Sequence, residues 1–235
     1  MPESKTLGVQ AVNEQVGSRA LLVATAAYLL LAAVGLMAVG TFPAATETGD
    51  QLVTWFRENG GSVRLFVWAL TVAILPLAIM IACLRRLLPA PHRDVFLIGA
   101  VSSLIAIEVW TWTWAGLALH ADDLNPATTR TVLDVAIFFG PVLTGSTTTM
   151  MAPVTLLGVL GQSRIPRWLG FLGLAAFLEQ AVETITIFGS SGFTQPGGAM
   201  NMQLGATLTV GWLVAFGIRG GLHGRAMKLA EPQAI

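Results

Sequence analysis

The chain has 235 residues, of which 54% are hydrophobic and only 11% are charged, and its formal net charge at pH 7 is zero. An ordinary soluble domain has about 25% charged residues, so this chain has too few charges to cover itself with a hydrated surface. The composition therefore indicates a membrane protein whose surroundings are the lipid bilayer. The balanced charge and the lack of a basic stripe exclude nucleic acid as a partner, and the single cysteine excludes an intrachain disulfide.

Six apolar stretches are each long enough for a membrane-spanning helix, which needs roughly 20 apolar residues. Helices are required, because unpaired backbone groups are costly in lipid. The first stretch is of full spanning length and lacks a clear A-x-A cleavage site at its exit, so we expect an anchored helix and not a cleaved signal peptide. No internal repeat or break in composition divides the chain, so we expect one all-α domain over 1–235. The expected spans are 20–40, 65–84, 95–119, 131–160, 168–189 and 199–218.

Basic residues are distributed unevenly between the two sides of the expected bundle. With six spans both termini share one side, and the segments on that side contain ten Lys and Arg residues, against Arg57, Arg64 and Arg130 on the other. Short cytoplasmic segments contain the excess of positive charge in membrane proteins. We therefore expect a multi-pass protein of the cell membrane with both termini in the cytoplasm.

The segment after the first span, GDQLVTWFRENGG at 49–61, has apolar residues at helical spacing. Asp50 is the expected cap of this helix, and Gly60 and Gly61 are expected to end it. We expect a short helix in the outer membrane interface. It is either an anchor that uses Trp55 or a lid over an outward-opening pocket.

The fourth stretch is longer than a bilayer requires and contains two prolines. Pro141, Gly145 and Pro153 surround a run of hydroxyl residues within FFGPVLTGSTTTMMAP. A proline removes one helical hydrogen bond, and Ser and Thr side chains can bond to the freed carbonyls. We expect a kinked helix, which either lines a binding site that includes Thr148 or is a tilted structural helix.

Four carboxylates fall within the expected spans, namely Glu108, Asp134, Glu179 and Glu183. A charge near the middle of a span costs roughly 2.5–3.5 kcal/mol on translocon scales, so these residues should face the bundle interior or a wet cavity. Glu179 and Glu183 are four residues apart and share a helix face, which Thr186 continues. No basic residue is expected at the depth of Glu108 or Glu179. We therefore expect at least one carboxyl to keep its proton at neutral pH, because burial and like-charge repulsion disfavour its ionised form.

Tryptophans surround Glu108 in the sequence IAIEVWTWTWAGLALH at 105–120. Trp112 is one helical turn from Glu108 and is the expected aromatic wall of a pocket, since an indole face can stabilise a cation. Trp110 and Trp114 share another side of the helix, and Trp114 is expected to be an interface anchor.

These acids also have purely structural interpretations. Asp134 is four residues from Arg130, a spacing typical of an ion pair on a helix. A single buried glutamate can be a hydrogen-bond donor between helices and no more. Three acids together exceed what packing needs, so we expect Glu108, Glu179 and Glu183 to be functional.

Neither a metal nor a cofactor is expected. The three histidines are not spaced as ligands on one helix, and the single cysteine has no second cysteine beside it. Motifs for phosphate binding and for a nucleophile elbow are absent.

The run SRIPRWLG at 163–170 opens the fifth expected span. This run, the chain length and the six spans resemble the six-helix bacterial membrane family described as domain of unknown function 4386, over about residues 20–220. The resemblance implies a membrane helix bundle in a bacterium. It implies no activity and no catalytic residues, because the family has no assigned activity.

Three functions are consistent with these features. The leading hypothesis is an outward-opening pocket among spans three to five that binds a lipophilic small molecule or acts on it by general acid–base chemistry. Small integral-membrane terpene cyclases and sterol isomerases are similar in using buried acids and tryptophans on carbocations. The alternatives are a proton-coupled small-molecule transporter, which at this size requires a homodimer, and a non-enzymatic accessory or binding subunit. The expected acid–base residues are Glu108, Glu179 and Glu183, and the expected substrate-binding residues are Trp112, Asp134, Thr148 and Thr186.

Overall fold

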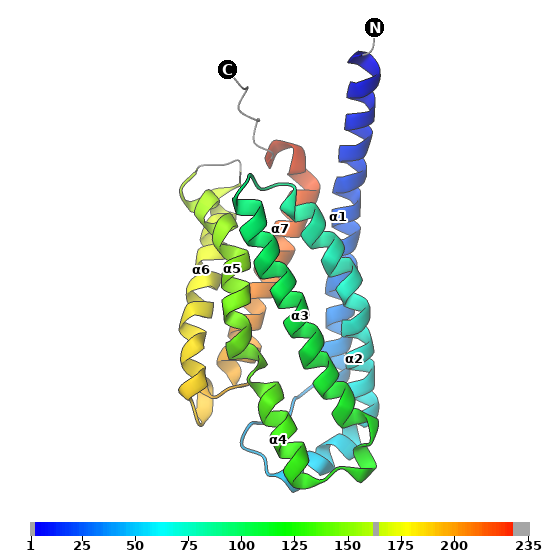
Figure 1. Cartoon of the computed structure of the whole chain (residues 1–235), viewed down its shortest axis with the longest axis vertical. Coiled ribbons are helices and arrows are strands. Elements are labelled where there is room, and N and C mark those ends of the chain that lie inside the picture. The colour runs from blue at the N-terminus through cyan, green and yellow to red at the C-terminus, as the bar shows by residue number, and fades with distance from the viewer. Residues whose placement is uncertain (1–2, 162–164, 228–235) are drawn as a thin grey trace.

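The computed structural model describes residues 3–161 and 165–227, with side chains for 17–161 and 165–223. The described ranges are helical and contain no strand (Figure 1). Six stretches of the described chain are long and apolar enough to cross a membrane, one in each region where a span is expected: Gly17–Val39, Gly49–Arg85, His92–Leu119, Pro126–Val159, Arg167–Phe188 and Met200–His223. Ser163 and Arg164, which begin the SRIPRWLG run, lie outside the described residues.

Seven α-helices and four shorter helical segments make up the described chain. The α-helices are α1 (Glu3–Val39), α2 (Gly49–Arg85), α3 (His92–Leu119), α4 (Pro126–Ile137), α5 (Phe139–Val159), α6 (Arg167–Glu183) and α7 (Ala206–Met227). The shorter segments are the 3₁₀ turns η1 (Ala121–Asp123), η2 (Thr184–Phe188) and η3 (Gly192–Thr194), and the π-helical segment η4 (Met200–Gly205).

Helix α1 begins and α7 ends at the same end of the bundle, and α4 lies at the opposite end (Figure 1). We call these the terminal end and the distal end. Helix α2 packs between α1 and α3, and α3 packs on α5. Helix α6 packs on α5 and also contacts α7. The segment η4 contacts both α5 and α6. The elements α5, α6 and η4 therefore meet in the distal half of the bundle.

The start of α2 differs from the expected start. The helix is capped by Thr48 and Gln51, whose side chains bond to each other's backbone N–H groups in a capping box. Asp50, the expected cap, lies instead in the first turn of the helix. The threonine hydroxyl and the glutamine amide together satisfy two backbone donors, which a single aspartate does not.

The expected short helix at 49–61 is not a separate element. Helix α2 continues through Gly60 and Gly61 to Arg85 without interruption. Gly60 is buried against Ala121, so tertiary packing outweighs the weak helix propensity of glycine here. The 37 residues of α2 make it about 55 Å long, longer than the hydrocarbon core of a bilayer.

The fourth span is broken at Phe138 into α4 and α5, which confirms the expected kink. Pro141 has no N–H to donate to the carbonyl of Ile137. The Thr144 hydroxyl donates to the Pro141 carbonyl at 2.7 Å, so the hydroxyl residues do bond back to the backbone as expected. Pro153 lies inside α5 without ending it.

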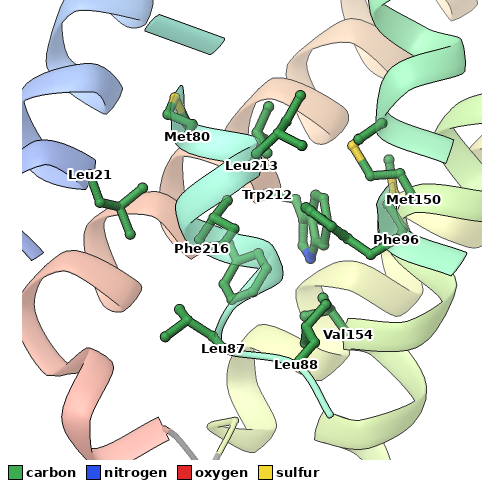
Figure 2. Close-up of a cluster of buried hydrophobic side chains, with 14 of the residues drawn as sticks. Leu21, Met80, Leu87, Leu88, Phe96, Met150, Val154, Trp212, Leu213 and Phe216 are labelled. Atoms are coloured by element: carbon green, nitrogen blue, oxygen red, sulfur yellow. The ribbon is translucent and has the colours of Figure 1, made fainter. Parts of the chain in front are cut away.

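Two clusters of buried apolar side chains hold the helices together. The larger surrounds Trp212, Phe96 and Phe216 and joins α1, α2, α3, α5, α6 and α7 (Figure 2). The smaller contains Phe66 and Trp114 and joins the end of α1 to α2, α3 and α4. In a bilayer such clusters are stabilised mainly by close van der Waals packing.

Candidate functional site

A cluster of hydrogen-bonded polar side chains is buried among α5, α6, η2 and η4. We call it the acid–amide cluster, because it contains two glutamates that accept hydrogen bonds from two side-chain amides. Its centre lies in the distal half of the bundle, inside three of the candidate spans. Its members are Thr147, Glu179, Gln180, Glu183, Thr186 and Asn201.

Gln180 lies at the centre of the acid–amide cluster. Its Oε1 accepts a hydrogen bond of 2.5 Å from the hydroxyl of Thr147 on α5. Its Nε2 donates to Glu183 Oε2 at 2.5 Å and to Glu179 Oε2 at 3.0 Å. A side-chain amide nitrogen has two hydrogens, so one Gln180 can serve both glutamates at once. The two acids are therefore held by one shared donor.

Asn201 reaches one of these acids, Glu183, from the beginning of the last span. Its Nδ2 donates to Glu183 Oε1 at 2.5 Å and to the Thr186 hydroxyl at 3.2 Å. Its Oδ1 accepts a hydrogen bond of 2.9 Å from the backbone N–H of Gly197. Glu183, which is 2% exposed, thus accepts an amide hydrogen bond on each of its two oxygens.

The local backbone lets the last span approach the acids closely. A Cβ atom on Gly205 would lie 2.3 Å from Glu183 Oε2 and 3.1 Å from Glu179 Oε2, so a larger residue does not fit here. Gly205 ends the π-helical segment η4, which also contains Asn201. Single π-helical turns occur frequently at functional sites. Here the π-helical turn places the Asn201 amide against Glu183 and Gly205 against both carboxyl groups.

One oxygen of the acid–amide cluster has no partner within the described residues. Glu179 Oε1 is inaccessible to solvent and accepts no hydrogen bond there. Neither Glu179 nor Glu183 forms an ion pair with a described basic side chain. A buried polar atom without a partner is costly. Glu179 Oε1 is therefore the atom at which the cluster can gain a bond, by holding a proton or by contacting a bound molecule.

Three of the expected site residues belong to the cluster, namely Glu179, Glu183 and Thr186. Thr148 does not, because its hydroxyl bonds back to the carbonyl of Thr144 at 2.6 Å. Its neighbour Thr147 occupies the place expected for Thr148. One residue corresponds to about 100° of rotation around an α-helix, which is enough to turn the hydroxyl away from α6.

Glu108 and Trp112 are not joined to the acid–amide cluster. Glu108 is half-buried on α3 and forms no hydrogen bond or ion pair with any described side chain. Trp112 is 66% exposed on the same helix, so its ring faces the surroundings of the bundle. The hydrogen bonds therefore connect only Glu179 and Glu183 among the described residues, whereas the sequence predicts a group of three acids beside Trp112.

Trp114 is 3% exposed, so its ring is part of the core and does not face the surroundings as an anchor would. It packs against Phe42 with ring centroids 5.1 Å apart. Trp110 packs beside Trp114, as expected for residues four apart, and also stacks on Phe139 at 4.7 Å. This face of α3 turns toward α2 and the chain after α1, which explains its burial.

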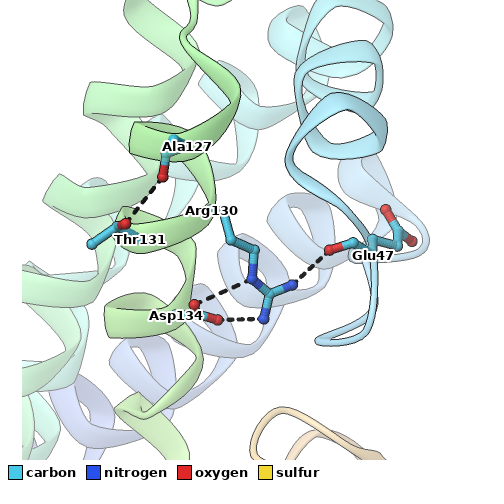
Figure 3. A network of polar contacts seen from close by, with 5 residues as sticks. All are labelled: Glu47, Ala127, Arg130, Thr131 and Asp134. Carbon is cyan, nitrogen blue, oxygen red and sulfur yellow. Dashed lines mark hydrogen bonds and ion pairs between the residues drawn. The ribbon is translucent and has the colours of Figure 1, made fainter.

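Asp134 is not part of the acid–amide cluster. It forms an ion pair on the surface of α4. Arg130 Nε donates to Asp134 Oδ2 at 3.2 Å, and Arg130 Nη2 contacts the other carboxylate oxygen (Figure 3). Arg130 Nη1 also donates to the backbone carbonyl of Glu47 at 2.7 Å. The pair therefore ties α4 to the segment that precedes α2, which is the structural interpretation of this spacing.

A separate concave region of about 480 Å³ lies beside the first turns of α2. Its lining is acidic and includes Trp55, but no hydrogen bond connects it to the acid–amide cluster. Among the described side chains, no group of three or more His, Cys, Asp or Glu residues is arranged to hold a metal ion.

Sequence reasoning missed Thr147, Gln180 and Asn201, because it searched the spans for charge. A detectable signal existed. Gln180 and Asn201 are side-chain amides within apolar stretches, and such residues commonly form hydrogen bonds between membrane helices. Their spacing from the acids on α6 then identifies Gln180 as a partner of Glu183, three residues away.

The described chain is a helix bundle with six stretches long and apolar enough to cross a membrane, and with a buried and a half-buried glutamate held by amides. No protein family, curated protein or solved structure matches the chain. Membership in the domain of unknown function 4386 family stays a prediction.

Proposed function

We propose that the protein is a proton-coupled carrier of a small molecule in a bacterial cell membrane, with the acid–amide cluster as its proton-binding site. The observation that supports this most directly is the sharing of one Gln180 amide by Glu179 and Glu183 without a described basic partner. Acids within membrane spans are expensive, and proton relays are a recurrent reason for their presence.

The interruptions of the helices also favour a carrier. Carrier sites are often formed by discontinuous helices near the middle of the membrane. The break between α4 and α5 lies next to the cluster, since a Cβ atom on Gly140 would be 3.1 Å from that of Asn201. The 3₁₀ turn η2 contributes Thr186, and the π-helical turn η4 contributes Asn201. Three interrupted helices thus border the two acids.

The distribution of basic residues orients the proposed carrier. Both termini are cytoplasmic, so the distal end faces outward. Helix α6 runs from the terminal end to the distal end, and Glu183 is its last residue. The acid–amide cluster then lies in the outer half of the membrane. A chain without an internal repeat is expected to work as a homodimer.

Solute-driven proton flux in proteoliposomes tests the carrier. The purified protein is reconstituted with a pH-sensitive dye in the lumen, and a panel of small amines, carboxylic acids and neutral solutes is added outside. At least one solute should change the lumenal pH with the wild type. Glu179→Gln should abolish that change, because it removes the proton-binding carboxyl and keeps an oxygen for Gln180. Glu108→Gln, outside the cluster, is the matched control and should retain the change.

Two results would contradict the carrier. One is a solute-driven pH change of equal size with Glu179→Gln and with the wild type. The other is an infrared carboxyl band that stays constant between about pH 5 and pH 9 in the wild type, with the same constant band in Glu179→Gln. The second result would show that Glu179 exchanges no proton in this range.

General acid–base chemistry on a lipophilic molecule is the second candidate. The unpartnered Glu179 Oε1 favours it, since such an atom is free to accept or deliver a proton at a bound substrate. Incubation with isoprenoid and sterol-like lipids tests this candidate. Turnover that Glu179→Gln abolishes supports it, and turnover that the variant retains contradicts it. An accessory subunit, the third candidate, needs the cluster only to hold its helices together.

A further inference from the structure

Each of the two side-chain amides in the acid–amide cluster is held in one orientation. The Oδ1 atom of Asn201 accepts a hydrogen bond of 2.9 Å from the backbone N–H of Gly197. A backbone N–H can only donate, so the NH₂ group of Asn201 must face the other way, toward Glu183. The Asn201 amide therefore cannot turn over without losing a hydrogen bond at each end.

Gln180 is oriented in a similar way by α5. Its Oε1 accepts the hydrogen bond of 2.5 Å from Thr147, which leaves its NH₂ group for Glu179 and Glu183. The opposite orientation would turn the amide oxygen toward two glutamates and give them no donor. Both amides therefore present N–H groups, and not oxygens, to the acids.

These orientations treat the two glutamates differently. Glu183 accepts an N–H donor at each of its oxygens, from Gln180 at Oε2 and from Asn201 at Oε1. Glu179 accepts one at Oε2 only, and no described donor faces its Oε1. A protonated carboxyl has an O–H of its own, which cannot point at an N–H donor. Glu183 thus has no oxygen at which a proton fits, whereas Glu179 has one.

The elements packed on this part of α6 bring no other charge to the two acids. Helix α5 and the segments η2 and η4 contain no titratable residue. The other titratable residues of α6 and α7 lie toward the terminal end, at Arg167 and from Arg219 onward. Hydrogen-bond donors, and not a neighbouring base, therefore distinguish the two acids.

We propose that Gln180 and Asn201 are positioning residues that divide the roles of the two acids, so that Glu183 stays ionised and Glu179 alone holds the exchangeable proton. Hydrogen bonds donated to a carboxylate favour its ionised form. Two carboxylates that share one site repel each other, so an ionised Glu183 favours protonation of Glu179. The inference rests on the proposed function and deepens it: the carrier binds one proton, at Glu179, and keeps Glu183 as a fixed anion.

Infrared spectra of the full-length protein in lipid at neutral pH test this division of roles. Every sample contains Glu108→Gln, so that a third acid within a span does not contribute. This parent protein should show a protonated-carboxyl band, which Glu179→Gln should abolish. Glu183→Gln should retain the band, since Glu179 still holds its proton. The division is wrong if the parent protein shows no band, if the band survives Glu179→Gln, or if Glu183→Gln abolishes it.

A further variant tests the positioning role of Asn201. Asn201→Ala removes the donor at Glu183 Oε1 and opens that oxygen to a proton. The band that Glu179→Gln abolishes should therefore return when Asn201→Ala is added to that variant. If Asn201 only tied the helices together, its loss would lower stability without restoring the band, and this result would overturn the positioning role. Asn59→Ala, which removes an amide bonded to the Trp55 carbonyl of its own helix, is the matched control and should not restore the band.

Failure of this division is distinguishable from failure of the carrier. If a solute drives proton flux with the wild type but the band survives Glu179→Gln, the carrier stands and the division of roles is overturned. If no solute drives proton flux, the carrier is contradicted, and the infrared bands still decide which glutamate holds the proton.

Discussion

Asn201 donates a hydrogen bond of 2.5 Å to Glu183 and thereby joins the beginning of the last span to the end of α6. The same side chain accepts a hydrogen bond from the backbone of Gly197. The segment between the fifth and sixth spans is therefore connected to a buried acid through a single residue. The cluster holds two helices and the chain between them in one arrangement.

Asn201→Leu should destabilise the protein. The leucine leaves Glu183 Oε1 and the Gly197 N–H without their partner, and each buried group left unpaired costs about 1–3 kcal/mol. We expect a loss of about 3 kcal/mol in unfolding free energy in detergent, measured by denaturant titration. Asn59→Leu is the control, because Asn59 bonds only to a carbonyl of its own helix. Equal stability of the two variants would contradict a role for Asn201 as the connection.

Gly205→Ala should also destabilise the protein, for a steric reason. The new Cβ would lie 2.3 Å from Glu183 Oε2, so either the carboxyl or the segment η4 must move. Overpacking of this kind costs about 1–3 kcal/mol. Gly211→Ala, in α7 of the same span, meets nothing within 4 Å, and should stabilise the protein through helix propensity. Thermal unfolding of both variants measures the difference, and a stabilising Gly205→Ala would refute the close approach.

Thr147→Val and Thr148→Val distinguish two adjacent hydroxyls. Thr147→Val removes the donor to Gln180 Oε1 and should cost about 1–3 kcal/mol, because that oxygen is buried. Thr148→Val removes a bond to the backbone of its own helix and should change stability by less than about 0.5 kcal/mol. Unfolding midpoints in one detergent give the comparison. Similar costs for both would show that Gln180 does not depend on Thr147.

The six spans and the break in the fourth were predictable because their causes are local. Hydropathy over about 20 residues identifies a span, and Pro141 removes a hydrogen bond wherever the helix packs. The pairing of Glu179 with Glu183 was predictable for the same reason, because it follows from the helical repeat. The choice of partner on another helix is not a local property.

The rotation of each helix about its own axis depends on packing across the bundle. Gly158 on α5 lies against Gly170 on α6, where a Cβ atom on Gly158 would be 2.7 Å from the Gly170 Cα. A Cβ atom on Gly99 of α3 would be 2.3 Å from the backbone nitrogen of Met150. These contacts set which faces meet. They bring Thr147 and not Thr148 to Gln180, and they leave Glu108 without a polar partner among the described residues.

Asp134→Asn should have little effect. Asp134 and Arg130 are partly exposed on the surface of α4, and exposed ion pairs contribute about 0–1 kcal/mol. We expect a stability change below about 1 kcal/mol and unchanged solute-driven proton flux. Arg130→Ala should cost more, because it also removes the bond to the Glu47 carbonyl. A loss of flux in Asp134→Asn would contradict a purely structural role and would support the predicted role of Asp134 in substrate binding.

Glu183→Gln should destabilise the protein even though it removes a charge from the membrane interior. Both oxygens of Glu183 accept amide hydrogen bonds, one from Gln180 and one from Asn201. A glutamine has only one acceptor oxygen, so its NH₂ group must face one of these donors, which costs about 1–3 kcal/mol. Glu108→Gln has no such conflict, because Glu108 bonds to no described residue, and it should leave stability unchanged or higher. Denaturant titration of the two variants measures the contrast. A stabilised Glu183→Gln would mean that relief from buried charge outweighs the lost hydrogen bond, and that the amides do not hold this acid in place.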